Sequence, residues 1–264
     1  MKNNKAVKHF GLCGHPIAHS LSPRLFEAAY PKDGFSYEII PASTPAEALR
    51  LFVEGGFMGM NVTAPFKTSI LPLVHRQTQE CAAIGACNLI LKEGDLLVAH
   101  NTDYLGVAHS IDEANAQVQG ALCLLLGAGG AAKAAAYALL KAGALLLWAN
   151  RTSAHIPNFF LDRPITPLPL AQIGHHLPQS NLILNTLPLS LPNTQILRFH
   201  PSQTVFDASY AARPLEQPAT KAGAKYIGGE RWLLHQAVPS FEAMTGICPN
   251  LADMEQVIQN LFLS

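Results

Sequence analysis

The sequence lacks the features that mark secreted, metal-binding and membrane proteins. Its five cysteines are odd in number and form no Cys-x-x-Cys pair, which argues against a disulfide framework and predicts reduced thiols in a cytoplasmic protein. The eleven histidines show no spacing typical of a zinc site, so we expect no bound metal. The most apolar stretch, residues 121–149, is interrupted by lysines and glycines. A membrane span needs about 20 consecutive apolar residues, so none is expected.

Charge is also scarce. Only 14% of the residues are charged and the formal net charge is zero, which gives no reason to expect nucleic acid or an anionic membrane as a partner. The basic residues 1–5 are not followed by an apolar segment, so we predict no signal peptide. In contrast, 49% of the 264 residues are hydrophobic, which is enough for a core and for two domains. The expected partner is a small-molecule substrate, and the sequence suits a monomer or a homodimer equally.

A glycine-rich turn at residues 127–132, Gly-Ala-Gly-Gly-Ala-Ala, organises the middle of the chain. An apolar run at 121–126 precedes it and an alanine-rich run follows it, which predicts a buried strand, a turn and a helix. In dinucleotide-binding folds, the N–H groups of such a turn and the helix N-terminus bind a pyrophosphate. We therefore predict a dinucleotide site here.

The end of the next predicted strand indicates which dinucleotide binds. NAD enzymes usually carry an acidic residue there, about 20 residues after the turn, to bind the ribose 2′-hydroxyl. This sequence has Asn150-Arg151-Thr152 at that point and no acidic residue nearby. A guanidinium and small hydrogen-bond donors suit a 2′-phosphate, so NADP is favoured. The alternative is that Arg151 is an ordinary surface arginine.

The rest of the chain alternates between strand and helix patterns. A hydroxyl N-cap at Ser22 followed by proline predicts a helix to Ala29, and Thr44 to Glu47 forms a capping box. A helix is expected after Lys67, to about residue 75, and another from 104 to 116. Seven prolines between residues 157 and 192 argue against a long crossover helix there. Further strands are expected at 9–14, 37–40, 59–62, 145–149, 182–184, 204–206 and 225–227, and a hairpin at 88–91 with 96–100. Further helices are expected at 214–222, 231–245 and 251–263.

These patterns predict an α/β protein with two domains and a cleft between them. One is an N-terminal, open and mostly parallel α/β sheet, and the other is a Rossmann-type dinucleotide-binding domain. We expect the first, substrate-binding domain to contain residues 1–104 and 236–264. The second, NADP-binding domain would contain residues 105–235.

Several polar residues follow the predicted strands directly. Each has a plain structural explanation: Lys67 as a surface lysine, and Ser20, Ser22 and Asp103 as helix caps. They share one property, which is that they lie at the C-terminal ends of strands or in adjoining turns. In an open α/β sheet, ligands bind at that edge.

Six motifs, in order along the chain, resemble those of the shikimate dehydrogenase family. They are His19-Ser20-Leu21-Ser22-Pro23, Gly59 to Lys67 (GMNVTAPFK), Gly85-Ala86-Cys87-Asn88, Asn101 to Gly106 (NTDYLG), the turn at 127–132 and Asn150-Arg151-Thr152. The resemblance covers nearly the whole chain. It implies a cytoplasmic, NADP-dependent oxidoreductase that reversibly reduces 3-dehydroshikimate to shikimate, in the biosynthesis of chorismate and the aromatic amino acids.

The resemblance also implies a role for individual residues. Lys67 and Asp103 would form the catalytic dyad. The substrate-binding residues would be Ser20, Ser22, Thr63, Lys67, Asn88, Asp103, Tyr210 and Gln236. The cofactor-binding residues would be Gly127, Ala128, Gly129, Gly130, Ala131, Asn150, Arg151, Thr152 and Gly229.

The chain departs from the family pattern in a few places. His15 and His155 stand where the family often has asparagine and arginine, and the second change softens the NADP preference. Residues 211–215 and 231–233 also differ, which concerns the C-terminal half of the cleft. Two alternatives follow: a paralogue that acts on quinate, and a non-catalytic, NADP-binding regulatory protein. The intact pair of Lys67 and Asp103 argues against the second alternative, because a binding protein needs neither group.

Overall fold

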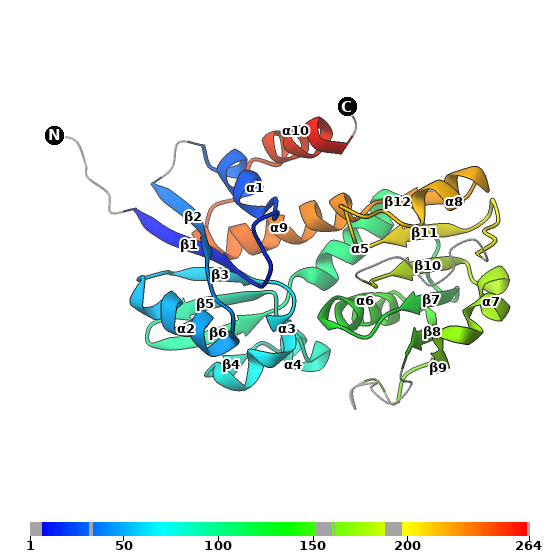
Figure 1. The fold of residues 1–264 in the computed structure, drawn as a ribbon, viewed down its shortest axis with the longest axis horizontal. Coiled ribbons are helices and arrows are strands. Elements are labelled where there is room, and N and C mark those ends of the chain that lie inside the picture. The colour runs from blue at the N-terminus through cyan, green and yellow to red at the C-terminus, as the bar shows by residue number, and fades with distance from the viewer. Residues whose placement is uncertain (1–6, 32–33, 152–159, 161, 188–196, 263–264) are drawn as a thin grey trace. The chain divides into compact units, whose positions relative to one another are not determined.

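The computed structural model describes residues 7–31, 34–151, 160, 162–187 and 197–262, and the chain forms two compact units (Figure 1). Unit 1 consists of Met1–Thr102 and Gln236–Ser264, and unit 2 consists of Asp103–His235. The chain therefore passes from one unit to the other twice. The second passage lies inside helix α9, Gly229–Thr245.

Unit 1 is built on a six-stranded sheet with the order β2-β1-β3-β5-β6-β4. Strand β1 runs parallel to β2 and β3, and β4 runs parallel to β6. Strand β5 is antiparallel to β3 and β6, as expected for the predicted hairpin. The predicted α/β sheet with mostly parallel pairs is confirmed. The strands are β1 Lys8–Cys13, β2 Phe35–Ile40, β3 Gly59–Val62, β4 Arg76–Gln77, β5 Leu89–Glu93 and β6 Leu96–His100.

One helix of unit 1 begins with half of the predicted capping box. In α2, Thr44 Oγ1 accepts the N–H of Glu47 at 3.2 Å. The Glu47 carboxylate returns to Ser43, whose N–H it accepts at 2.9 Å, rather than to Thr44. At the other end of the chain, α10 packs against α1. The helices are α1 Ser22–Ala29, α2 Pro45–Glu54, α3 Phe66–Ser69, α4 Gln79–Ile84, the second part of α9, and α10 Leu251–Phe262.

Two helices of unit 1 differ from the sequence prediction, one in its N-cap and the other in its length. The cap of α1 is Leu21, and Ser22 is already helical. Ser20 Oγ accepts the Ser22 N–H at 3.3 Å, so Ser20 takes the capping role predicted for Ser22. The helix expected after Lys67 is only a single turn, α3, followed by a 3-10 turn at Leu71–Leu73. Pro72 lacks the N–H that an α-helix would need at that point, which explains the break.

Unit 2 is built on a wholly parallel sheet with the order β12-β11-β10-β7-β8-β9. This is the topology expected of a Rossmann-type domain. The edge strand β9 was not predicted, because it contains Pro167 and Pro169. Proline is tolerated in an edge strand, because the main-chain groups on its outer side have no neighbouring strand with which to form hydrogen bonds. The strands are β7 Leu122–Leu126, β8 Leu145–Asn150, β9 Ile165–Pro169, β10 Leu182–Asn185, β11 Thr204–Asp207 and β12 Lys225–Ile227.

Both faces of this second sheet are buried. On one face, Cys123 and Leu125 pack in a cluster with Leu139 of α6. On the other face, Leu124 and Leu126 pack in a cluster with Ala219 of α8. This double burial explains why β7 is apolar at consecutive positions rather than at alternate ones. The helices are α5 Asp103–Glu113, α6 Gly130–Lys141, α7 Ile173–His176, α8 Glu216–Lys221 and the first part of α9.

Two further expectations concern the helices of unit 2. Helix α5 ends at Glu113 rather than at residue 116, and Asn115 adopts a left-handed backbone with φ of 50°. Within the described part of residues 157–192 there is no long crossover helix, as predicted, but only 3-10 turns and the short α7.

No helix among the described residues has the length and apolar character needed to cross a membrane. In the same part of the chain, no three histidine, cysteine or acidic side chains gather as a metal site would require.

Candidate active site

Ser20 and Ser22 lie together at the start of α1. Their hydroxyl oxygens are 3.4 Å apart, and Ser22 is buried while Ser20 is half-buried. The N-terminus of a helix carries partial positive charge and favours an anion. Two hydroxyl donors at such a terminus suit the binding of a carboxylate.

Tyr37 connects this pair to the interior of unit 1. Burial raises the pKa of Tyr37 well above its usual range, Cys13 adds to this effect, and a hydrogen bond with Ser22 acts in the opposite direction. The phenol therefore remains protonated, and it donates to Asn61 Oδ1 at 2.7 Å. Tyr37 is thus a neutral, half-buried member of the network that contains Asn61.

Asn61 and Asn88 continue the network toward α9. Asn61 Nδ2 donates to Ser240 Oγ at 2.6 Å and to the main-chain oxygen of Asn88 at 3.0 Å. Asn88 Nδ2 donates to Gln236 Oε1 at 3.0 Å. Two predicted substrate ligands, Asn88 and Gln236, are therefore in direct contact.

Thr102 completes the network beside the predicted catalytic residue Asp103. The Thr102 N–H donates to Asn88 Oδ1 at 2.7 Å, and its hydroxyl donates to the main-chain oxygen of Gln236 at 3.0 Å. All of these groups are neutral amides and hydroxyls, which both donate and accept hydrogen bonds. Such a set suits a ligand that carries several hydroxyl groups.

Lys67 lies in the short helix α3, which main-chain hydrogen bonds fix in place. The Thr63 N–H donates to Cys13 O at 2.9 Å, and the Cys87 N–H donates to Lys67 O at 2.8 Å. The buried Phe66 anchors the same turn. Thr63 and Lys67 are both half-buried. The structure therefore holds these two predicted ligands on a rigid segment next to residues 85–88.

Asp103 is the first residue of α5 and is buried, with 4% of its surface exposed. It belongs to unit 2, whereas Lys67 belongs to unit 1. The two members of the predicted dyad are therefore carried by different units of the chain.

The glycine turn of unit 2 is held from two sides. Trp148 Nε1 donates to the Gly127 oxygen at 2.6 Å, and Thr186 Oγ1 donates to the Leu126 oxygen at 2.7 Å. Gly127 has a φ of 110°, and a Cβ at this position would collide with Thr186 Oγ1. Only glycine suits this backbone and this close approach.

The N-terminus of α6 is open beside this turn. Its cap residue is Gly129, no side chain caps it, and a Cβ at Gly129 would have no atom within 4 Å. The first N–H groups of a helix need partners, and a phosphate can supply them. The turn therefore suits a pyrophosphate, and it is formed by residues 127–131 as predicted from the sequence: Gly127, Ala128, Gly129, Gly130 and Ala131.

The remaining predicted cofactor residues lie at the ends of strands. Asn150 ends β8, and the exposed Arg151 follows it. Thr152 and His155 lie outside the described residues. Gly229 begins α9, where a Cβ would collide with the Ala208 oxygen. Tyr210 is half-buried in the loop that follows β11.

Sequence reasoning missed several members of the unit 1 network. Asn61 and Thr102 stand inside quoted motifs, so the motifs themselves contained the signal. Tyr37 and Ser240 had no such signal, because they lie 24 and 179 residues from their common partner Asn61.

Comparisons with known proteins agree on one family. The model of the family described as "Shikimate dehydrogenase substrate binding domain" matches residues 12–90. A protein of Carboxydothermus hydrogenoformans named shikimate dehydrogenase (NADP(+)) is 33% identical, over 98% of this chain and 99% of that relative. A solved structure of shikimate dehydrogenase from Aquifex aeolicus superposes with a TM-score of 0.86 at 28% identity, covering 98% of this chain and all of the other. A Thermus thermophilus enzyme, solved with NADP(H) and shikimate, gives a TM-score of 0.81 at 28% identity, covering 96% of this chain and 99% of that one.

Proposed function

Because the chain belongs to the shikimate dehydrogenase family, we propose that it catalyses the reversible reduction of 3-dehydroshikimate to shikimate with NADPH. It is an NADP-dependent oxidoreductase acting on a CH–OH group, and its product serves the synthesis of chorismate and the aromatic amino acids. Unit 1 binds the substrate and unit 2 binds NADP. A cytoplasmic location is part of the proposal, which is supported by the finding that the five cysteines form no disulfide bond.

The substrate is held by the polar groups of unit 1. Ser20 and Ser22 bind its carboxylate at the start of α1. Thr63, Asn88 and Gln236 bind its hydroxyl and carbonyl groups, with Tyr210 as a further contact. The single observation that carries this proposal is the continuous network from Tyr37 to Gln236, because its neutral donors and acceptors suit a ligand rich in hydroxyls.

Lys67 and Asp103 act on the reacting carbonyl. Negative charge develops on the C3 oxygen during reduction, and the Lys67 ammonium stabilises that oxygen and then protonates it. The Asp103 carboxylate orients Lys67 and accepts a hydrogen bond from a substrate hydroxyl. In the reverse direction Lys67 takes the proton from the hydroxyl.

The residues of unit 2 suit the cofactor. When bound, NADPH supplies the hydride. The cradle at 127–131 leaves room for a pyrophosphate, because a Cβ at Gly129 would meet no atom within 4 Å. Asn150 and Arg151 bind the 2′-phosphate, with Thr152 as a further predicted contact, and Gly229 lies at the nicotinamide end.

The test is to incubate the purified protein with 3-dehydroshikimate and NADPH. We expect loss of NADPH to match the appearance of shikimate, identified by mass spectrometry, with no reaction when either compound is left out. The reverse reaction, with shikimate and NADP⁺, should yield 3-dehydroshikimate. Absence of turnover in both directions, by a folded protein, would refute the proposal.

A further inference from the structure

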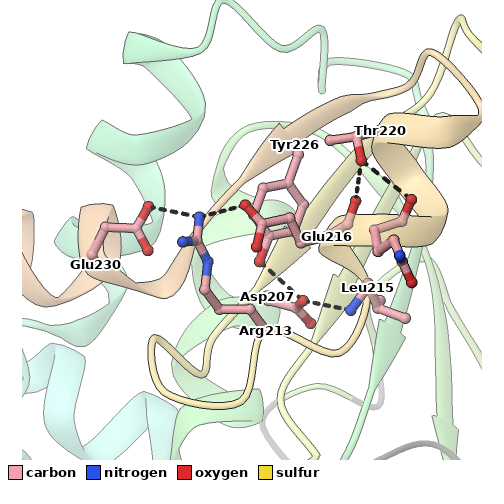
Figure 2. Close-up of polar contacts among 8 residues, drawn as sticks. Asp207, Arg213, Leu215, Glu216, Thr220, Tyr226 and Glu230 are labelled. Atoms are coloured by element: carbon pink, nitrogen blue, oxygen red, sulfur yellow. Dashed lines mark hydrogen bonds and ion pairs between the residues drawn. The ribbon is translucent and has the colours of Figure 1, made fainter. Parts of the chain in front are cut away.

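Arg213 joins three elements of unit 2 around the loop that carries Tyr210. Figure 2 shows its guanidinium between the carboxylates of Glu216 and Glu230. Nη2 lies 2.8 Å from Glu216 Oε1 and 3.8 Å from Glu230 Oε1. The guanidinium carbon also lies 5.6 Å from the centre of the Tyr226 ring. Arg213 thereby ties its loop to α8, α9 and β12.

Both ends of this loop are fixed by Asp207, the last residue of β11. Asp207 Oδ2 accepts the Leu215 N–H at 2.9 Å and the Tyr226 hydroxyl at 3.1 Å (Figure 2). Its other oxygen accepts Asn185 Nδ2 at 2.9 Å. Residues 208–215 therefore form a closed loop, and its shape depends on what holds the segment between the two ends.

Glu230 provides the opposing charge at the start of α9. It is buried, with 7% of its surface exposed, and its side chain folds over Gly228. Among the described residues, neither Glu230 Oε2 nor Arg213 Nε has a hydrogen-bond partner. The attraction between the two charges therefore holds Glu230 in place, because a buried carboxylate without a countercharge is strongly unfavourable.

The backbone at Arg213 is unusual in a way that supports a positioning role. Its φ is 42°, in the left-handed region that arginine seldom adopts. Such a conformation persists only where the surroundings hold it, and it is found preferentially at functional sites. On the far side of the loop, Ala208 approaches Gly229 so closely that a Cβ there would collide with its oxygen. The loop therefore contacts the start of α9 at two points: Ala208 packs against Gly229, and Arg213 attracts Glu230.

We propose that Arg213 and Glu230 form an ion-pair clamp that positions Tyr210 for substrate binding. The inference rests on the proposed function, in which Tyr210 contacts the substrate. Arg213 and Glu230 are positioning residues, because they act through the loop rather than on the substrate. The clamp joins residues inside or beside the two segments, 211–215 and 231–233, at which this chain departs from the family pattern.

Arg213→Gly is the informative variant. Glycine adopts positive φ freely, so this change removes the guanidinium and relieves the backbone at the same position. We expect the thermal unfolding midpoint to fall, because Glu230 is left buried without a countercharge, and the relief of the backbone offsets only part of that loss. The KM for shikimate should rise by roughly tenfold to a hundredfold, as a displaced substrate ligand does, and the calorimetric Kd for shikimate should rise by a similar factor. The KM for NADP⁺ should change less, since its main predicted ligands lie at 127–131 and 150–151.

Asn115→Gly is the matched control. Asn115 is the other non-glycine residue with a positive φ in the described part of the chain. It lies in unit 2 and takes no part in the proposed site. This variant should keep wild-type kinetics. Arg213→Lys should restore part of the affinity for shikimate, and added guanidinium ion should lower the KM of Arg213→Gly.

The pair itself is tested by Glu230→Gln and by the double variant. Glu230→Gln should raise the KM for shikimate much as Arg213→Gly does, and the double variant should be no worse than either. Glu216→Gln should have little effect, because the Glu216 side chain is partly exposed and solvent screens its ion pair with Arg213. If the two single effects multiply, the residues act independently and the clamp is refuted.

A folded Arg213→Gly protein with wild-type affinity for shikimate would also overturn the clamp. If Arg213→Gly does not fold, Arg213→Lys and Glu230→Gln must still raise the KM for shikimate selectively, and failure to do so refutes it equally. These outcomes differ from failure of the proposed function, which would appear as a wild-type protein that does not convert shikimate at all.

Discussion

The network around Asn61 in unit 1 and the loop around Arg213 in unit 2 hold their polar groups differently. In unit 1, Asn61, Asn88 and Gln236 are joined through neutral hydrogen bonds. In unit 2, Arg213 and Glu230 depend on the attraction of opposite charges, and each leaves one polar atom without a hydrogen bond among the described residues. A network of neutral hydrogen bonds requires each donor to face an acceptor, so it specifies one arrangement of side chains. An ion pair is less directional and mainly keeps the two charged groups close together. We infer that unit 1 selects the substrate by its pattern of hydroxyls and that the charges of unit 2 serve positioning.

The same contrast holds for the two turns. The turn at 127–131 presents main-chain N–H groups, which any dinucleotide can use. The turn at 63–67 presents side chains, Thr63 and Lys67, whose chemistry is specific to a reaction. In the proposed function, the first turn binds the cofactor and the second acts on the substrate.

The largest expected effect is at Lys67. Lys67→Ala should lower kcat by about 10²- to 10⁴-fold, because it removes the proton donor, and should change the KM for shikimate much less. Steady-state rates in both directions measure this split. Lys8→Ala, a change at an exposed lysine of β1 in the same unit, serves as the control. A Lys67→Ala enzyme with nearly normal kcat would remove Lys67 from the mechanism.

Asn88→Ala tests whether the neutral network stabilises unit 1. Thr102 and Gln236 would each lose a buried partner, and every such loss costs about 1–3 kcal/mol. Urea-induced unfolding should therefore show a lower free energy of unfolding, together with a higher KM for shikimate. Asn88→Asp buries a carboxylate without a countercharge against the oxygens of Thr102 and Gln236, so it should lower the free energy of unfolding at least as much. Unchanged stability in Asn88→Ala would show that the network does not matter for the fold.

Arg151→Ala should affect only the choice of cofactor. The side chain is exposed, so the unfolding temperature should not change. Loss of one charge-assisted hydrogen bond to a phosphate costs about 1.5–3 kcal/mol, which is at least tenfold in the KM for NADP⁺. The KM for NAD⁺ should stay the same. An equal change for both cofactors would mean that Arg151 does not recognise the 2′-phosphate.

The smallest expected effect concerns Glu113, which contacts Arg231 and His235. Burial alone would raise the pKa of the Glu113 carboxyl, but the hydrogen bonds and charges of Arg231 and His235 outweigh it and lower the pKa below its ordinary value of 4.5. A lowered pKa in the folded state stabilises the protein above the unfolded pKa, and this stability is lost as the pH falls through the folded value.

Glu113→Gln should therefore lower the free energy of unfolding near neutral pH by less than about 1 kcal/mol, since the carboxylate is partly exposed. The difference from the wild type should shrink as the pH drops below 4.5. Unfolding curves at several pH values measure it. A difference that is the same at every pH would show that the charge of Glu113 is not involved.

The sequence was most informative where periodicity and local signals agree. The apolar run of β7, the N-cap at Thr44 and the strand, turn and helix around residues 127–132 agree with the sequence prediction, because their causes lie within a few residues. It misled where local and tertiary effects compete, as in β9, whose prolines are tolerated only at a sheet edge.

Long-range partners could not be read from the sequence. Tyr37 and Ser240 meet Asn61 only after the sheet and α9 have formed. The pairing of Arg213 with Glu230 is of the same kind, since it depends on a left-handed backbone at an arginine that no local signal predicts. Candidate site residues can therefore be proposed from the sequence, whereas the contacts that hold them cannot.

The central claim is that unit 1 selects shikimate and unit 2 selects NADP. The most direct test is kcat/KM of the wild-type protein for shikimate and for quinate, each with NADP⁺ and with NAD⁺. We predict the highest value for shikimate with NADP⁺, with NADP⁺ preferred over NAD⁺ for both substrates. A higher value for quinate, or for NAD⁺, would contradict the account of unit 1 or of unit 2, respectively.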